Sequence, residues 1–131
     1  MKPDTILVLD FGGQYAHLIG RRIRENGVYS EVVSSNISAV DLANLSAKFN
    51  IKGLILSGGP ASVYDLGSPK ISRTIVDSRL PLLGLCYGHQ LLSHVFGGNV
   101  KKAERKEFGH TLAQVTKPVS ILNKLNRTEK V

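Results

Sequence analysis

The sequence predicts an α/β domain with an open, mostly parallel sheet between two layers of helices, and two observations predict it. Short apolar runs alternate along the chain with segments whose apolar residues recur at helical spacing. Glycine-containing loops directly follow three of these runs. Strands that alternate with helices pair in parallel through right-handed crossovers, so the three loops should meet at the carboxyl edge of the sheet, where such folds place their sites.

The first half of the chain supplies these elements in order. An apolar run at residues 6–9 predicts the first strand, and it leads into a loop at residues 10–14. The next helix should end at Asn26-Gly27, and arginines lie largely off its apolar face, which comprises Tyr15, Leu18, Ile19 and Ile23. The later elements are expected as a strand at residues 28–33, a helix at 40–49 with Ser38 or Asp41 near its start, a strand at 53–56, a short helix around 71–77 and a strand that opens at Pro81. Residues 99–119 should be extended, charged and antiparallel, and the residues after them carry little signal.

Composition limits the class of protein. With 131 residues, 42% of them hydrophobic, the chain can form one domain with a core. Its single cysteine excludes an intrachain disulfide and favours a reducing compartment. The apolar run near the N-terminus is too short for a signal peptide or a membrane span, so we expect a cytoplasmic protein with no membrane partner.

The net charge of +7 indicates either a surface that docks a partner or a face that is exposed to solvent. Only 6% of the residues are aromatic, and no stacking platform or recognition motif accompanies the charge, so a nucleic-acid partner is not expected. Charge alone does not separate a solvated face from a docking surface for a partner domain. The basic clusters are Arg21, Arg22 and Arg24; Lys101, Lys102, Arg105 and Lys106; and Lys117, Lys124, Arg127 and Lys130.

The only cysteine lies in the segment Gly84-Leu85-Cys86-Tyr87-Gly88, between an apolar run and a helical pattern. This segment matches the strand-turn-helix elbow that carries a nucleophile, with Cys in place of Ser. Glycine is expected at positions 84 and 88, because a nucleophile at the apex of so tight a turn pushes these two residues together. The apex backbone should be strained, and the helix N-terminus should lower the pKa of the thiol. A buried structural cysteine is the alternative.

A second glycine motif, Ser57-Gly58-Gly59-Pro60, ends an apolar strand upstream of the elbow. Glycines there let backbone N–H groups approach a ligand. An acyl-transfer site needs an oxyanion hole formed by the N–H after the nucleophile and by one N–H from a neighbouring loop. We therefore expect the N–H groups of Tyr87 and Gly59 to form this hole, with an ordinary Gly-Gly-Pro turn as the alternative.

Together the two motifs resemble class I (triad) glutamine amidotransferases, through residues 56–60 (LSGGP) and 84–90 (GLCYGHQ). Within that family, residues 9–15 (LDFGGQY) and 21–25 (RRIRE), and Tyr87, are similar to GMP synthetases in particular. The amidotransferases of anthranilate synthase and carbamoyl phosphate synthetase usually carry Leu at the position of Tyr87. The likeness extends to roughly residues 107–109 and implies a flavodoxin-like, three-layer fold.

The resemblance implies roles for five residues: Cys86 as nucleophile, Gly59 and Tyr87 at the oxyanion, and Gly58 and Gln90 in binding L-glutamine. It also implies that ammonia passes to an ATP pyrophosphatase (synthetase) domain, fused or separate, that aminates XMP. ATP and Mg would serve that partner, so we expect no metal and no cofactor in residues 1–131. The synthetase domain should be absent from this chain, which has no pyrophosphate loop of the S-G-G-x-D-S type. A homodimer formed through a missing part is compatible with the resemblance.

The thiolate also needs a general base and a carboxylate that orients it. In the family these are a His and a Glu close together, downstream of the region covered here. No His-x-Glu pair occurs, and none of the four histidines suits that place: His17, His89, His94 and His110. We therefore expect residues 1–131 to be a truncated amidotransferase domain with little or no glutaminase activity.

Three other functions stay open at this point. The first is an amidotransferase of another pathway, of the anthranilate or carbamoyl phosphate type. The second is an α/β peptidase, hydratase or redox sensor with a cysteine elbow, against which Gln90 and the Gly58-Gly59-Pro60 loop speak. The third is a non-catalytic module whose basic face docks a partner or nucleic acid.

Overall fold

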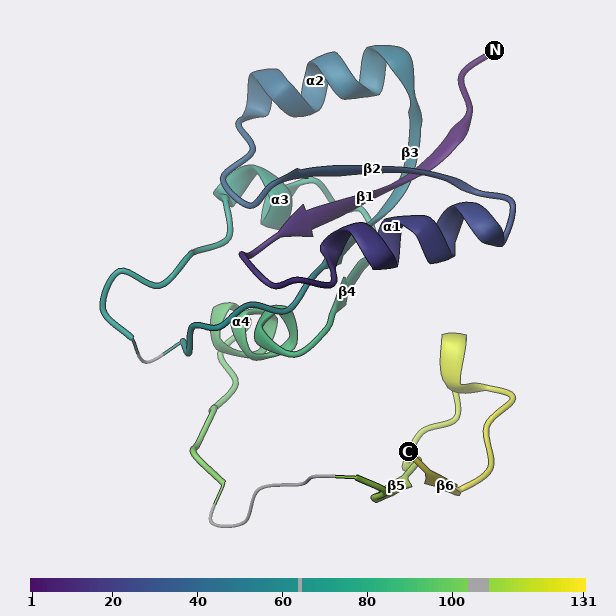
Figure 1. Cartoon of the computed structure of the whole chain (residues 1–131), viewed down its shortest axis with the longest axis vertical. Coiled ribbons are helices and arrows are strands. Elements are labelled where there is room, and N and C mark those ends of the chain that lie inside the picture. The colour runs from purple at the N-terminus through teal and green to yellow at the C-terminus, as the bar shows by residue number, and fades with distance from the viewer. Residues whose placement is uncertain (64, 104–108) are drawn as a thin grey trace. The chain divides into compact units, whose positions relative to one another are not determined.

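Four parallel strands form a sheet in the order β2-β1-β3-β4, as Figure 1 shows. The computed structural model describes residues 1–63, 65–103 and 109–131, and the chain divides into two units, Met1–Val100 and Lys101–Val131. The sheet belongs to the first unit, and its strands are β1 (Asp4–Asp10), β2 (Tyr29–Ser34), β3 (Asn50–Leu56) and β4 (Leu82–Gly84). All four predicted strands are confirmed.

The central strand β1 is the most deeply buried element because it pairs on both sides. Its Val8 lies beside Val32 of β2 and beside Ile55 of β3, and both pairings are parallel. Its residues Leu7, Val8 and Leu9 are 0% exposed. Parallel sheets are covered on both faces, which explains why the apolar run is continuous rather than alternating.

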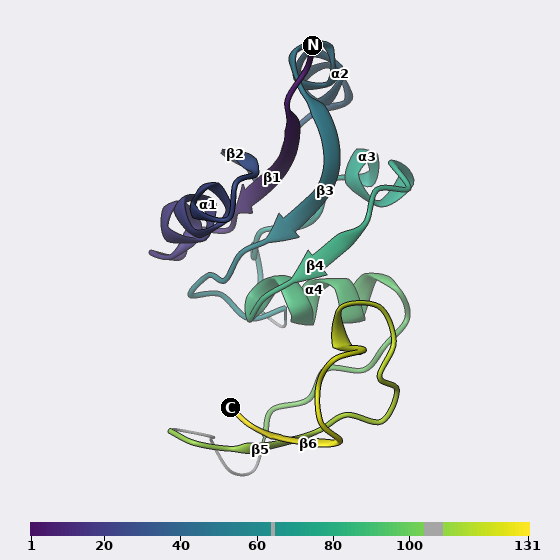
Figure 2. The same cartoon turned by 90° about the vertical axis from the view of Figure 1, so that its right-hand side faces the viewer.

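The helices α1 (Ala16–Glu25), α2 (Ala39–Lys48), α3 (Arg73–Asp77) and α4 (Tyr87–Val95) flank the sheet. Residues of α2, α3 and α4 pack with Leu7, Leu9, Leu54 and Leu56 in one core cluster. Helix α1 lies on the opposite face, where it contacts β1 and β2 (Figure 2). The three layers that the sequence predicts are therefore present.

Helix α1 packs through small residues rather than through the apolar face that the sequence suggests. Tyr15 precedes the helix as its N-cap and is 59% exposed, and Leu18 is also exposed. The buried residues are Ala16 and Gly20, and a Cβ added to Gly20 would lie 3.3 Å from Ser30 Oγ and from Val32 Cγ2. Because the helix lies close to β2, there is room for a glycine at position 20, and the larger side chains lie at the edge of the contact.

Helix α2 begins at a capping box in which both predicted candidates take part. The Ser38 hydroxyl accepts a hydrogen bond from the Asp41 N–H at 3.1 Å, and the Asp41 carboxylate accepts one from the Ser38 N–H at 3.1 Å. Ser38 and Asp41 are thus paired at the helix start rather than being alternatives.

The second unit contains a short antiparallel pair, β5 (Leu112–Gln114) and β6 (Thr128–Lys130), and a 3₁₀ helix, Ser120–Leu122. The expected antiparallel structure is found, although its partner strand lies in the segment that carries little sequence signal. Part of the predicted extended region, residues 104–108, lies outside the described residues. Among the helices that the structure describes, none has the length and apolar character to cross a membrane.

Candidate active site

Cys86 lies at the turn from β4 to α4, at the carboxyl edge of the sheet, and it is exposed. Its backbone has φ 52° and ψ −114°, a left-handed conformation that L-residues rarely adopt. The turn is held by two hydrogen bonds, from the Leu85 N–H to the Leu56 carbonyl at 2.9 Å and from the Gly88 N–H to the Leu85 carbonyl at 3.0 Å. The predicted elbow, its strained apex and its exposed sulfur are therefore present, and a cysteine buried among aliphatic side chains is excluded.

The two elbow glycines are required by close backbone contacts of different kinds. A Cβ added to Gly84 would lie 2.6 Å from the backbone of Gly88 and of His89, as expected from the tight turn. A Cβ added to Gly88 would instead lie 2.3 Å from the Leu56 carbonyl oxygen, because α4 passes directly over the end of β3. Real Cβ atoms essentially never come this close to other atoms, so both positions exclude side chains.

The glycine loop after β3 lies against the cysteine. A Cβ added to Gly58 would be 3.2 Å from Cys86 Cβ and 3.8 Å from its Sγ, so bare backbone faces the thiol at this point. A Cβ added to Gly59 would collide with the Phe11 carbonyl oxygen at 2.3 Å. Among the described residues, no hydrogen bond engages the N–H of Gly59 or of Tyr87. Neither donor is therefore used by another group of the described residues.

The loop after β1 packs against this glycine loop. The Gly13 N–H donates to the Gly58 carbonyl at 3.2 Å, and a Cβ on Gly13 would lie 2.5 Å from the same oxygen. The buried Ser57 hydroxyl accepts a hydrogen bond from the Phe11 N–H at 3.2 Å and donates one to the Gly58 carbonyl at 3.3 Å. The three loops that the topology predicts at one edge are thus in contact. The sequence reasoning missed Ser57 as a buried link between two of them.

Tyr87 and Gln90 occupy the first turn of α4. Tyr87 is 2% exposed, its ring lies 5.5 Å from that of Phe11, and its hydroxyl donates to the Pro69 carbonyl. The Gln90 N–H donates to the Cys86 carbonyl at 3.1 Å, and its side chain is half-buried one turn from the sulfur. Within the described part of the chain, that side chain forms no hydrogen bond, so its amide is available for a ligand.

The histidines do not supply a partner for the thiol. His17, His89, His94 and His110 are all exposed, and among the described residues of the first unit no hydrogen bond joins His17, His89 or His94 to Cys86. Likewise, no three described His, Cys, Asp or Glu side chains form a group that could hold a metal ion. The expectation that residues 1–131 need no metal or cofactor stays a prediction.

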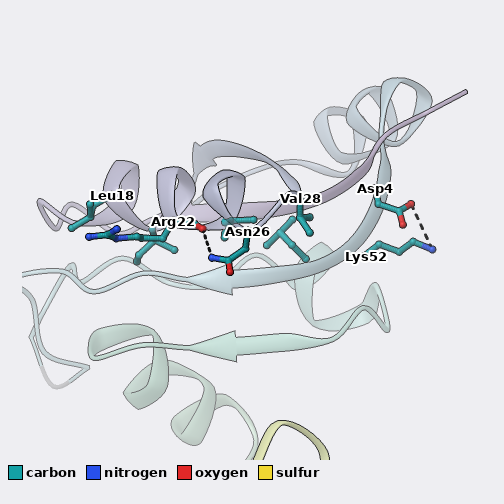
Figure 3. Close-up of a pocket in the computed structure, with 9 residues that line it drawn as sticks. Asp4, Leu18, Arg22, Asn26, Val28 and Lys52 are labelled. Atoms are coloured by element: carbon teal, nitrogen blue, oxygen red, sulfur yellow. Dashed lines mark hydrogen bonds and ion pairs between the residues drawn. The ribbon is translucent and has the colours of Figure 1, made fainter. Parts of the chain in front are cut away.

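A pocket of about 590 Å³ lies between helix α1 and the first halves of β1 and β3 (Figure 3). Apolar side chains of α1 and β1 form most of it, and its polar rim includes Asp4, Arg22 and Lys52. Arg22 donates to Glu25 at 2.9 Å, which lowers the pKa of that carboxyl, and Lys52 lies 3.9 Å from Asp4. We assign the candidate site to the elbow, because this pocket contains no nucleophile and its polar groups are exposed.

Comparison with known proteins agrees with this assignment. The sequence model of the family "Glutamine amidotransferase class-I" matches residues 7–131. The match extends past residues 107–109, where the likeness seen in the sequence ends. The chain is 47% identical over 120 residues to "GMP synthase [glutamine-hydrolyzing]" of Streptomyces coelicolor, covering 92% of this chain and 22% of that protein. It is 51% identical over 109 residues to the protein of the same name from Acetivibrio thermocellus, covering 83% of this chain and 20% of that protein. The chain thus spans about a fifth of the length of these relatives.

A solved structure shares the fold. The crystal structure of a protein assigned as a GMP synthase subunit, from Thermoplasma acidophilum, superposes with a TM-score of 0.81 at 33% sequence identity, covering all of this chain and 64% of that one. The elbow, the parallel sheet and the family match therefore lead to one conclusion: the chain belongs to the class I glutamine amidotransferase family.

Proposed function

We propose that this chain provides the nucleophile and the oxyanion donors for glutamine hydrolysis in a GMP synthase. The observation that carries the proposal is the approach of the bare Gly58 backbone to the exposed thiol, where an added Cβ would lie 3.8 Å from Sγ. The N–H groups of Gly59 and Tyr87, the residues that follow Gly58 and Cys86, form no hydrogen bond with the described residues. The combination suits a carbonyl whose oxygen gains negative charge when a thiolate attacks its carbon.

The reaction follows from these positions. The Cys86 thiolate attacks the carboxamide carbon of L-glutamine, a C–S bond forms, and the carbonyl electron pair moves to oxygen, where the N–H groups of Gly59 and Tyr87 receive it. The C–N bond then breaks, and the nitrogen takes a proton and leaves as ammonia. Water attacks the resulting thioester, which releases glutamate and returns the thiol.

Two features of the site support the individual roles. The sulfur lies on the residue that immediately precedes the nine-residue helix α4, so the first N–H groups of that helix follow it directly in the chain. The half-buried Gln90 amide, one turn further on, can hydrogen-bond the polar end of glutamine. The proton transfers need a base and an orienting carboxylate, which the family likeness assigns to a His and a Glu outside residues 1–131.

The fate of the nitrogen is proposed from the relatives. Those that match are GMP synthases, so we propose that the ammonia passes to an ATP-dependent synthetase domain, fused or separate, which aminates XMP to GMP. ATP and Mg belong to that partner. The similarity to GMP synthases disfavours the anthranilate and carbamoyl phosphate pathways as the destination.

A chloromethyl ketone analogue of L-glutamine tests the proposal on this chain. The thiolate displaces chloride from the analogue and forms a thioether, while the ketone oxygen occupies the oxyanion hole. We expect stoichiometric labelling at Cys86, protection by L-glutamine, and no labelling of Cys86→Ala. Salt-sensitive RNA binding without labelling would instead support a docking module.

Two further measurements separate hydrolysis from synthesis. The 131-residue chain alone should show little or no glutamine turnover, because none of its four histidines suits the place of the general base. In a synthase that contains this chain, Cys86→Ala should abolish glutamine-dependent but not ammonia-dependent GMP synthesis. Loss of both activities would mean that Cys86 is structural.

A further inference from the structure

The side chain of Tyr87 is the one part of the elbow that the proposed chemistry does not use. The mechanism requires only the backbone N–H of this residue, yet the side chain is 2% exposed and points into the core rather than toward solvent. Any residue except proline could supply the N–H. A reason for a tyrosine must therefore come from what its ring and hydroxyl contact.

The ring contacts the residue that supports the oxyanion loop. Phe11 lies 5.5 Å away between ring centroids at an interplanar angle of 52°, a favourable tilted arrangement. The Phe11 carbonyl is the group that closes off Gly59, since a Cβ there would lie 2.3 Å from its oxygen. The position of Phe11 thus limits where the Gly59 backbone can lie.

The hydroxyl contacts the far end of the same loop. It donates to the Pro69 carbonyl, three residues before Ser72, which caps helix α3. One side chain therefore contacts two segments: the loop after β1, through Phe11, and the connection between β3 and α3, through Pro69. The Gly58-Gly59 pair begins that connection.

Tyr87 belongs to the core cluster and also borders a cavity. A pocket of about 250 Å³ lies there, with Ile71, Leu91 and His94 among its lining residues. Besides its packing in the core, the ring is oriented by the Phe11 contact and by the hydroxyl hydrogen bond. Loss of either should let the loop move relative to the sulfur.

We infer that the Tyr87 side chain is a positioning residue, which holds the Gly59 N–H at the distance from Cys86 Sγ that the oxyanion requires. The inference rests on the proposed function. Tyr87→Phe keeps the backbone N–H and the ring contact but removes the tie to Pro69. Phe11→Leu keeps the hydroxyl but removes the aromatic contact.

The test compares two reagents at the same sulfur. The chloromethyl ketone analogue of glutamine needs the oxyanion hole, whereas iodoacetamide alkylates the thiolate with little need for it. We expect Tyr87→Phe and Phe11→Leu each to slow labelling by the analogue about tenfold relative to labelling by iodoacetamide, since a misplaced oxyanion donor costs rate. Tyr29→Phe is the matched control, because its hydroxyl donates to the Glu31 carboxylate on the same strand, β2, and not to a residue of the elbow or its loops.

The outcomes separate this inference from the proposed function. If the original chain is labelled by the analogue and the ratio of the two rates stays the same in both variants, the positioning role is overturned while the proposed function stands. If the variants have lower melting temperatures and react more slowly with both reagents to the same extent, the role of Tyr87 is structural only. If the original chain shows no preference for the analogue over iodoacetamide, the proposed function itself fails.

Discussion

The Gly13 N–H donates to the Gly58 carbonyl at 3.2 Å, which joins two loops 45 residues apart in the sequence beside the Cys86 sulfur. The Gly58 carbonyl and the Gly59 N–H belong to the same peptide group, so the bond holds that group from its carbonyl side. The geometry of the proposed oxyanion hole therefore depends on Gly13, although this residue has no side chain that could contact the substrate.

Substitution of Gly13 by Ala should disturb this hole without removing any donor from it. The new Cβ would lie 2.5 Å from the Gly58 oxygen, so the loop must move. We expect labelling of Cys86 by the glutamine analogue to slow at least about tenfold, given the cost of losing one oxyanion donor. Alkylation by iodoacetamide serves as the control, and an unchanged ratio of the two rates would contradict the prediction.

Ser57→Ala should weaken both the fold and the site. The buried hydroxyl accepts from the Phe11 N–H, so its removal leaves that donor unsatisfied, at a cost of about 1–3 kcal/mol in the free energy of unfolding. Urea denaturation followed by circular dichroism measures this loss. Ser46→Ala, at an exposed position of α2, is the matched control and should change the stability little.

The elbow glycines should be among the least tolerant positions of the chain. A side chain at Gly84 or Gly88 meets backbone atoms at 2.6 Å or 2.3 Å, which cannot relax by rotating a side chain. We expect Gly84→Ala and Gly88→Ala each to destabilise the protein by about 2–3 kcal/mol or more. Wild-type melting temperatures in these variants would show that the turn is looser than described. Gly27→Ala, where an added Cβ meets nothing within 4 Å, tests the backbone strain of a glycine substitution by itself.

The capping box of α2 should make part of the stability depend on pH. Hydrogen bonds from the Ser38 hydroxyl and N–H lower the pKa of Asp41 below its usual 3.8. A lowered folded-state pKa stabilises the protein above the unfolded-state pKa, and this contribution is lost as the pH falls through the folded-state value. Asp41→Asn should therefore lower the melting temperature at neutral pH, and the difference should shrink below about pH 4. An equal difference in melting temperature at neutral pH and below about pH 4 would contradict this prediction.

Much of the fold could be predicted because its signals are local. The apolar runs around Leu7 and Leu54 are short, continuous and bounded by glycine, as buried parallel strands are, and the alternation with helices then sets the topology. The elbow could be predicted for the same reason. A five-residue motif fixed its turn, its strained apex and the need for glycine at both flanks.

The contacts between loops could not be predicted, because they join residues far apart in the sequence. Nothing near Tyr87 indicates that its hydroxyl reaches the carbonyl of Pro69, 18 residues earlier. The reason for glycine at position 88 also differs from the expected one, since it depends on Leu56 at the end of another strand. One signal was present: Phe11 continues the alternation of Leu7 and Leu9, which places its ring on the same face of the sheet as the core.

The left-handed backbone of Cys86 lowers the stability of the fold at the residue that the proposed chemistry requires. Holding a non-glycine residue at φ 52° costs about 1–3 kcal/mol, and glycine would adopt the same angle without that penalty. Cys86→Gly should therefore melt at a higher temperature than the original protein while being chemically inert. Selection for heat resistance alone would favour glycine at position 86, whereas the proposed reaction with glutamine requires the sulfur.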